Sequence, residues 1–219
     1  MKRKLPVLIL EFLAFLLIIA SPVFAGPFTG VGGDADYFPR DRFIGSAYVV
    51  PALYMDNTSG SLIIAAEGVI GSGDLAAFYK YGVQGSRTVA GMGLRKRIWD
   101  SENSLFGFTL IYDVDGLLAQ DTSVNGAYLG GIFSKKIDNL YPYVALLSTT
   151  YYTFTGAKIA GVDKWEYIYG SGIAGGVRYD YDANWSGRIE ANYNSLSPTA
   201  SMPGPKTVTS LIFAASYRK

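Results

Sequence analysis

The hydrophobic pattern of this chain has a period of two over most of its length. In the segment 105–115 every second residue is apolar or aromatic, and the residues between them form a mixed set that includes Asp113 and Asp115. The segments 165–181, 185–193 and 207–218 alternate in the same way. Successive side chains of a β-strand point to opposite faces. The pattern therefore predicts strands with one apolar, aromatic face and one mixed face.

Turn-forming residues divide the chain into ten such strands. The predicted strands are 43–55, 61–70, 74–83, 87–99, 104–116, 123–136, 140–154, 165–181, 185–194 and 207–218. The weakest part is 61–83, where two short strands join at Gly71-Ser72-Gly73, and an eight-stranded fold results if this hairpin is misassigned. The predicted fold class is all-β, an antiparallel up-and-down barrel with ten strands or, alternatively, eight.

Three features favour a transmembrane barrel with the apolar face outward over a soluble sandwich. Connections alternate between short polar turns, such as 100–103 and 182–184, and longer ones at 116–123, 155–164 and 195–206. Aromatic residues stand at strand ends, as in the interfacial girdles of membrane barrels: Trp99, Trp165, Tyr179, Tyr181, Trp185 and Tyr217. The opposite faces carry charges of both signs that suit a narrow lumen: Arg95, Arg97, Asp113, Asp115, Arg178, Asp180, Arg188 and Glu190.

With these features the chain resembles the small outer-membrane β-barrel family, which includes the OmpA-like membrane domains and porin-like surface proteins. The resemblance covers about residues 43–219 and is plainest in the strand-turn-strand run 175–193 and in the apolar closing strand. It implies bacterial outer-membrane lipids as surroundings and recognition of the last strand by the barrel-assembly machinery. The chain departs from the family at its end, where Arg218 and Lys219 follow Tyr217.

The N-terminus predicts export. Residues 2–4 are basic, an apolar run follows over 5–20, and Val23 and Ala25 suit a cleavage site after Ala25. We therefore expect a signal peptide over 1–25, a flexible lead-in over 26–42 that lacks alternation, and a barrel domain over 43–219. An uncleaved anchor is the alternative.

Composition then removes most enzyme classes. The 219 residues include no cysteine and no histidine, so thiol nucleophiles, imidazole-based triads and His or Cys metal sites are absent. The formal net charge of +1 gives no footprint for nucleic acid. We expect no cofactor, no metal and no catalytic residues.

The remaining candidate sites favour structural explanations. Asp34 and Asp36 lack the ligand spacing of a calcium loop, and we interpret Asp113 and Asp115 as part of a charge-compensated lumen rather than a catalytic pair. The tyrosines of 141–143 are interpreted as girdle residues rather than a stacking site.

The function expected is that of a non-enzymatic outer-membrane barrel with a structural or surface-interaction role, or a narrow pore with a largely filled lumen. Two alternatives stay open: a secreted soluble barrel that binds an apolar ligand, and an outer-membrane enzyme that works without histidine.

The signal peptide gives the first prediction. We expect the mature chain to begin at Gly26, because Ala25 ends the cleavage pattern. N-terminal sequencing of the protein from its native host checks this, and retention of Met1 would contradict it.

Overall fold

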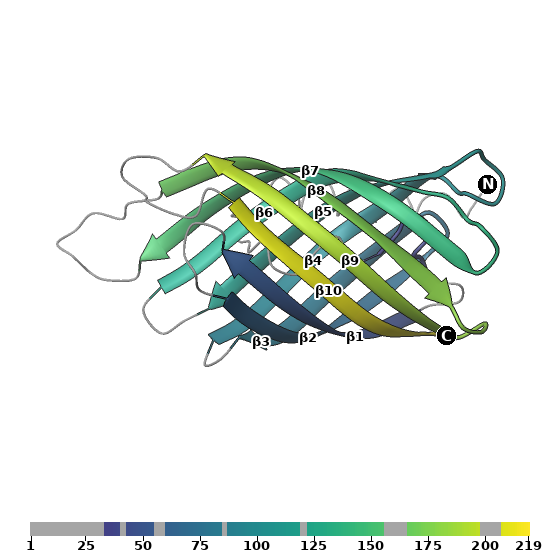
Figure 1. Ribbon diagram of the computed structural model, residues 1–219, viewed down its shortest axis with the longest axis horizontal. Coiled ribbons are helices and arrows are strands. Elements are labelled where there is room, and N and C mark those ends of the chain that lie inside the picture. The colour runs from purple at the N-terminus through teal and green to yellow at the C-terminus, as the bar shows by residue number, and fades with distance from the viewer. Residues whose placement is uncertain are drawn as a thin grey trace, which may run out of the picture.

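The fold is a closed barrel of ten antiparallel strands (Figure 1). The computed structural model describes residues 33–39, 43–54, 60–84, 87–118, 122–155, 166–197 and 207–219. The strands are β1 (Phe43–Tyr54), β2 (Gly60–Ser72), β3 (Leu75–Gln84), β4 (Arg87–Trp99), β5 (Gly107–Leu118), β6 (Thr122–Ser134), β7 (Leu140–Thr155), β8 (Glu166–Asp180), β9 (Trp185–Ser197) and β10 (Thr207–Arg218). No helix among the described residues has the length and hydropathy needed to cross a membrane.

Each strand pairs with its neighbours in sequence, and β1 pairs with β10 to close the ring. The predicted all-β, up-and-down barrel is confirmed, with ten strands rather than the alternative eight. The uncertain hairpin at 61–83 forms two full strands, β2 and β3, which pair from Ile64↔Val83 to Ser72↔Leu75. Gly73 in the tight turn between them has a φ of 64°, a left-handed conformation that glycine adopts without strain.

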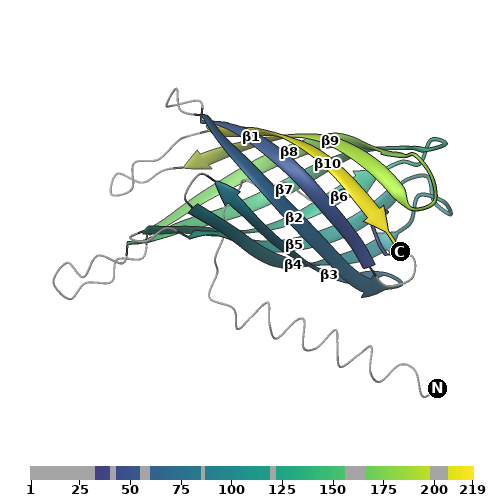
Figure 2. The ribbon, with the colours of Figure 1, turned by 90° about the horizontal axis from the view of Figure 1, so that it is seen from below.

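The connections β2–β3, β4–β5, β6–β7 and β8–β9, the start of β1 and the end of β10 lie at one end of the molecule, which we call the turn end (Figures 1 and 2). Two of these turns are held by an aspartate that accepts backbone N–H groups. Hydrogen bonds from Asn103 hold the pKa of Asp100 below its usual value, and those from Trp185 and Asn184 do the same for Asp182. At the other end, the expected long connection 116–123 is shorter than predicted, because β5 continues to Leu118 and β6 begins at Thr122.

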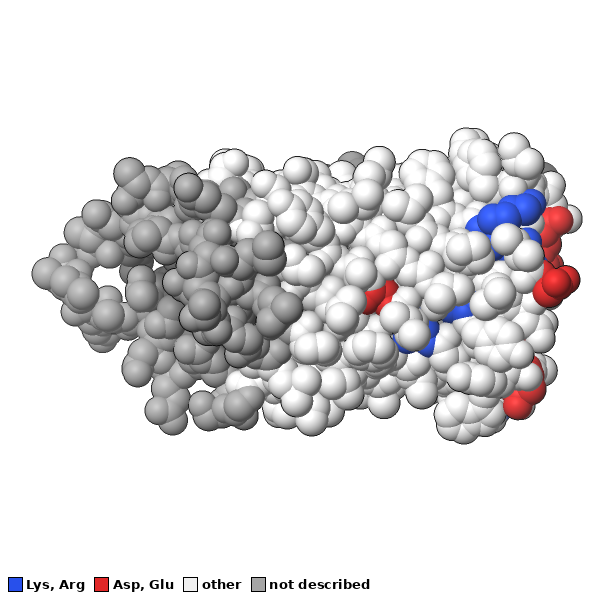
Figure 3. All heavy atoms as spheres, viewed as in Figure 1, with Lys and Arg blue, Asp and Glu red and all other residues white. Residues whose placement is uncertain are grey.

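The strand faces divide into a charged interior and an apolar exterior. In β3, for example, Ala76, Phe78 and Lys80 are buried inside, whereas Tyr79 and Tyr81 are exposed outside. Across the middle of the barrel the visible surface is almost free of charged side chains, apart from a small group seen between outer side chains (Figure 3). Charged side chains gather instead at the turn end (Figure 3). The exterior is therefore an apolar band, with a charged rim at the turn end.

Residues 33–39 do not form the flexible lead-in expected for 26–42. They lie inside the barrel mouth at the turn end, where Ala35, Tyr37 and Phe38 are buried with 0%, 1% and 5% exposure. The segment lacks alternation because it is not a strand, but its apolar side chains and carboxylates find partners on the inner wall. We call residues 33–39 the plug.

The apolar exterior gives a prediction about stability. Ile173 is 47% exposed in the middle of β8, where an arginine would face hydrocarbon if the barrel spans a bilayer. Ile173→Arg is expected to cost about 2–4 kcal/mol of unfolding free energy. Urea unfolding of the barrel in lipid vesicles, followed by tryptophan fluorescence, measures this.

Ile137→Arg is the matched control. Ile137 is 53% exposed but lies in the turn between β6 and β7, outside the apolar band. Its replacement should leave the unfolding free energy nearly unchanged. If Ile173→Arg and Ile137→Arg lower the unfolding free energy equally, the assignment of the outer wall as an apolar band is wrong.

Candidate functional site

Six of the eight charged residues expected in the lumen are buried in the structure. Arg95, Asp113, Asp115 and Glu190 are fully buried on the inner wall, and Arg178 and Arg188 are 1% and 4% exposed. Arg97 and Asp180 lie closer to the turn end. There the Arg97 side chain remains 23% exposed and pairs with Asp74, with its Nε 2.9 Å from the Asp74 Oδ1 atom.

The structure adds interior residues that the sequence analysis left out. These are Glu67 on β2, Lys80 on β3, Tyr48 on β1 and Tyr128 on β6, all buried, together with Arg218 at the end of β10. Glu67 and Lys80 interrupt the apolar stretch 61–83, and the alternation there places both on one side of the hairpin. That signal could have identified them.

Lys80 forms the centre of a buried ionic cluster. Its ammonium contacts the Asp113 Oδ2 atom directly and lies 3.7 Å from the Asp115 Oδ1 atom. The Tyr128 hydroxyl donates a hydrogen bond to the same Asp113 oxygen, and the Lys80 Nζ lies 5.1 Å from the Phe78 ring centroid. Because the cation already serves both carboxylates, Asp113 and Asp115 have the structural surroundings that the charge-compensated interpretation requires.

Two tyrosines predicted for the girdle lie inside instead. Tyr141 is 5% exposed and stacks under Arg178, with 3.8 Å between the guanidinium carbon and the ring centroid. Tyr143 is 6% exposed and donates a hydrogen bond of 2.6 Å to the Glu190 Oε2 atom. The girdle interpretation of 141–143 is therefore wrong, because both residues fall on the inner face of β7 and neutralise or cover lumen charges.

The plug is held by polar contacts to strands around the whole ring. Asp34 pairs with Arg178 on β8, 2.9 Å from its Nε atom. The Tyr37 hydroxyl hydrogen-bonds the hydroxyls of Ser46 on β1 (2.6 Å) and Ser216 on β10 (2.7 Å). These contacts tie the plug to the side of the ring formed by β8, β9, β10 and β1.

Two further contacts hold the plug from β5 and from the neighbouring turn. The Thr109 hydroxyl on β5 donates to the Ala35 carbonyl at 2.7 Å. Asp36 accepts hydrogen bonds from the Ser101 amide at 3.1 Å and the Ser101 hydroxyl at 2.5 Å. The Ala35 carbonyl and the Asp36 carboxylate therefore both have hydrogen-bond partners on the barrel.

Tyr37 lies among the guanidinium groups of three strands. The carbon atoms of the Arg95, Arg178 and Arg188 guanidinium groups lie 5.5, 5.7 and 5.7 Å from its ring centroid. Cations at this range are attracted to the face of an aromatic ring. The plug thus supplies an aromatic ring and the carboxylate of Asp34 to a strongly basic part of the lumen.

Several other buried polar atoms of the lumen have no hydrogen-bond partner among the described residues. They include both carboxylate oxygens of Glu67, all three guanidinium nitrogens of Arg188 and the hydroxyl of Tyr48. Buried polar groups are almost always hydrogen-bonded, to protein or to water. This part of the lumen therefore has the polar lining of a hydrated space rather than of a dry core.

The predicted interfacial aromatics that fall in the described residues are exposed near the turn end. Their exposures are 49% for Trp99, 41% for Tyr179, 68% for Tyr181, 52% for Trp185 and 39% for Tyr217. Neighbouring rings contact one another, with 5.1 Å between the centroids of Trp185 and Tyr217. Trp165 lies outside the described residues.

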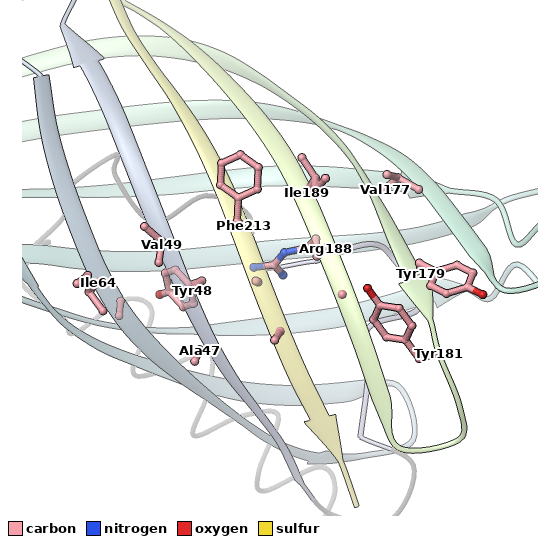
Figure 4. A pocket seen from close by; sticks show the side chains of 14 residues that line it. Ala47, Tyr48, Val49, Ile64, Val177, Tyr179, Tyr181, Arg188, Ile189 and Phe213 are labelled. Carbon is pink, nitrogen blue, oxygen red and sulfur yellow. The ribbon is translucent and has the colours of Figure 1, made fainter.

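The outer wall also has an apolar groove of about 530 Å³ over β9, β10 and β1. Its lining includes the apolar side chains of Ile189, Phe213 and Val49 and the small residues Ala215 and Gly187. Figure 4 shows Arg188 and Tyr48 among the side chains that line the groove. Among the described residues, no group of three or more histidine, cysteine, aspartate or glutamate side chains is placed to hold a metal ion.

Comparisons with known proteins give structural matches only. No family model matches the chain, and no curated protein sequence matches it. Among solved structures it is similar to Neisserial surface protein A, with 12% identity, coverage of 81% of this chain and 96% of that one, and a TM-score of 0.43.

Two further solved structures match to a similar degree. The N-terminal β-barrel domain of Pseudomonas aeruginosa OprF has 9% identity, coverage of 82% of this chain and 98% of that one, and a TM-score of 0.39. The Escherichia coli outer membrane protease OmpT has 7% identity, coverage of 84% and 98%, and a TM-score of 0.38. The expected resemblance to small outer-membrane barrels agrees with the closed, ten-stranded fold described above.

The Lys80 cluster gives a prediction about coupling. Lys80→Met leaves two buried carboxylates without their cation and is expected to cost about 3–5 kcal/mol of unfolding free energy. The same change should cost clearly less in a chain that already carries Asp113→Asn, because one carboxylate fewer loses its partner. Denaturant unfolding of the four chains of this double-mutant cycle measures the difference. Strictly additive losses would show that Lys80 and Asp113 do not stabilise each other.

Proposed function

We propose that this chain is a non-enzymatic outer-membrane β-barrel protein of a bacterium. One observation carries the proposal: the fold is inside out compared with a soluble protein. Large apolar side chains are exposed on the outer wall, among them Leu62, Met92 and Leu129 at 52%, 67% and 59%, whereas Lys80, Arg95 and Glu190 are buried inside. A contiguous apolar surface of this kind is stable in contact with lipid and aggregates in water.

The same distribution counts against a secreted soluble barrel that binds an apolar ligand. Such a protein would need an apolar lumen open to the ligand. Here Glu67, Asp113, Asp115, Arg178 and Arg188 line the inner wall. An apolar ligand inside would separate these charges from their partners and from water.

The placement in the envelope follows the common arrangement of bacterial barrels. Short turns face the periplasm and longer loops face outward in such proteins, so the turn end of this barrel faces the periplasm in our proposal. The predicted signal peptide 1–25 would export the chain. The last strand, β10, with Leu211, Phe213 and Tyr217 on its outer face, would be the part that the assembly machinery recognises.

The role that fits best is structural or surface-interacting, with a lumen too obstructed for large solutes. The plug and the Lys80 cluster both occupy the lumen, and Asp113 and Asp115 are engaged with Lys80. The chain also has no histidine, the side chain that most often serves as a proton shuttle at neutral pH. Any surface ligand would meet the connections opposite the turn end, of which 156–165 and 198–206 lie outside the described residues.

Heat-modifiable migration tests the proposal. A folded membrane barrel resists detergent at room temperature, so we expect the protein to fractionate with the outer membrane and to change its gel mobility only after boiling. A chain carrying Ile173→Arg should show a smaller folded fraction under the same conditions, and one carrying Ile137→Arg should match the wild type. Recovery of the folded protein in a detergent-free soluble fraction would refute the proposal.

A further inference from the structure

The plug lies beside three buried arginines of the lumen. Tyr37 fills the space between Arg95, Arg178 and Arg188, and Asp34 neutralises Arg178 from the plug side. All three arginines are at most 4% exposed. The plug therefore covers basic groups that would otherwise face the mouth at the turn end.

The arginines differ in the partners that the wall gives them. Arg178 also lies 3.5 Å from Asp180, so this one has a second carboxylate partner. Arg188, in contrast, has no hydrogen-bond partner for any guanidinium nitrogen among the described residues, and it faces the Tyr37 ring. Without the plug, Arg188 would be available to an incoming anion, with Arg95 and Arg178 close by.

Side-chain contacts, rather than strand pairing, attach the plug to the barrel. No described strand pairs with it. It is held by the ion pair at Asp34, by hydrogen bonds at Ala35, Asp36 and Tyr37, and by burial of its apolar side chains against the inner wall. Hydrogen bonds of this kind contribute about 0.5–1.5 kcal/mol each, far less than the pairing of a whole strand. Release of the plug would break these side-chain contacts but no strand pairing, so the barrel can stay closed without it.

We propose that residues 33–39 are a displaceable plug, and that its release exposes a basic passage through Arg95, Arg178 and Arg188 that takes up small inorganic anions. The proposal rests on the outer-membrane function above only in requiring that the barrel inserts into a bilayer. Beyond Tyr37, the unpartnered polar atoms of Arg188, Glu67 and Tyr48 continue the passage as a hydrated lining.

The test uses the absence of cysteine from the chain. Asp34→Asn and Tyr37→Phe together remove the ion pair and the two serine hydrogen bonds while keeping the size of the plug. Adding Asp36→Cys and Ser101→Cys places a thiol pair where the two side chains touch at 2.5 Å. The disulfide then holds the plug in its seat, and a reductant releases it from the same barrel.

The measurement is single-channel conductance in a planar bilayer with a potassium chloride gradient. We expect the oxidised barrel to be silent or to show only small currents, and the reduced barrel to conduct several-fold more, with a reversal potential shifted toward the chloride equilibrium potential. Adding Arg188→Gln should reduce this shift while the conductance stays raised. The chain with Ser101→Cys alone is the control and should not respond to reductant.

The outcomes separate this inference from the proposed function. Equal currents before and after reduction, in barrels that insert and show heat-modifiable migration, would overturn the plug proposal and leave the outer-membrane function standing. If the reduced barrel conducts without preference for chloride, the proposal that Arg95, Arg178 and Arg188 form a passage for anions is wrong. Failure of the wild-type chain to insert into any bilayer would instead overturn the proposed function.

Discussion

Closure of the sheet is the constraint on which the rest of the structure depends. Because β1 pairs with β10, no strand has a free edge in the described barrel. A lipid bilayer offers no hydrogen-bond partners to backbone groups, so a sheet can cross it only as a closed ring. Once the ring is closed, the alternation of side chains divides each strand between an apolar outer wall and a lumen of fixed width. Every charged residue within the apolar band must then lie inside.

The narrow lumen explains why its charges occur in compact groups. A charge removed from bulk water needs partners close at hand. Lys80 forms ion pairs with Asp113 and Asp115. Tyr143 donates a hydrogen bond to Glu190, and the ring of Tyr141 stacks on the guanidinium group of Arg178. Glycines on the inner wall make room for these groups: a side chain at Gly176 would collide with the ring of Tyr143, and one at Gly93 with Phe78. The glycine-rich composition of the strands is therefore linked to the size of the lumen residues.

The sequence was sufficient to predict the strands and to identify the charged face of each, because both depend on a period of two that neighbouring residues repeat. It was less informative where a residue's surroundings come from distant strands. Tyr141 and Tyr143 lie near a strand end, where either face accepts an aromatic ring, and only their register with β8 places them inside.

The plug was missed for a similar reason. Gly33, Asp34 and Asp36 look like ordinary loop residues, and their partners on β8 and in the turn before β5 come much later in the chain. Local patterns predict local structure, and a segment that binds inside a finished barrel has no local pattern of its own.

The position of Tyr37 also has a consequence for how the molecule is made. Its hydroxyl bridges Ser46 on β1 and Ser216 on β10, and these two serines hydrogen-bond each other at 3.0 Å across the closing seam of the ring. The first part of the barrel chain to be synthesised therefore gains its binding site only when the last strand has joined the first. Seating of the plug is a late event that depends on completion of the barrel, so an unfinished or misregistered ring would leave its mouth open and residues 33–39 exposed.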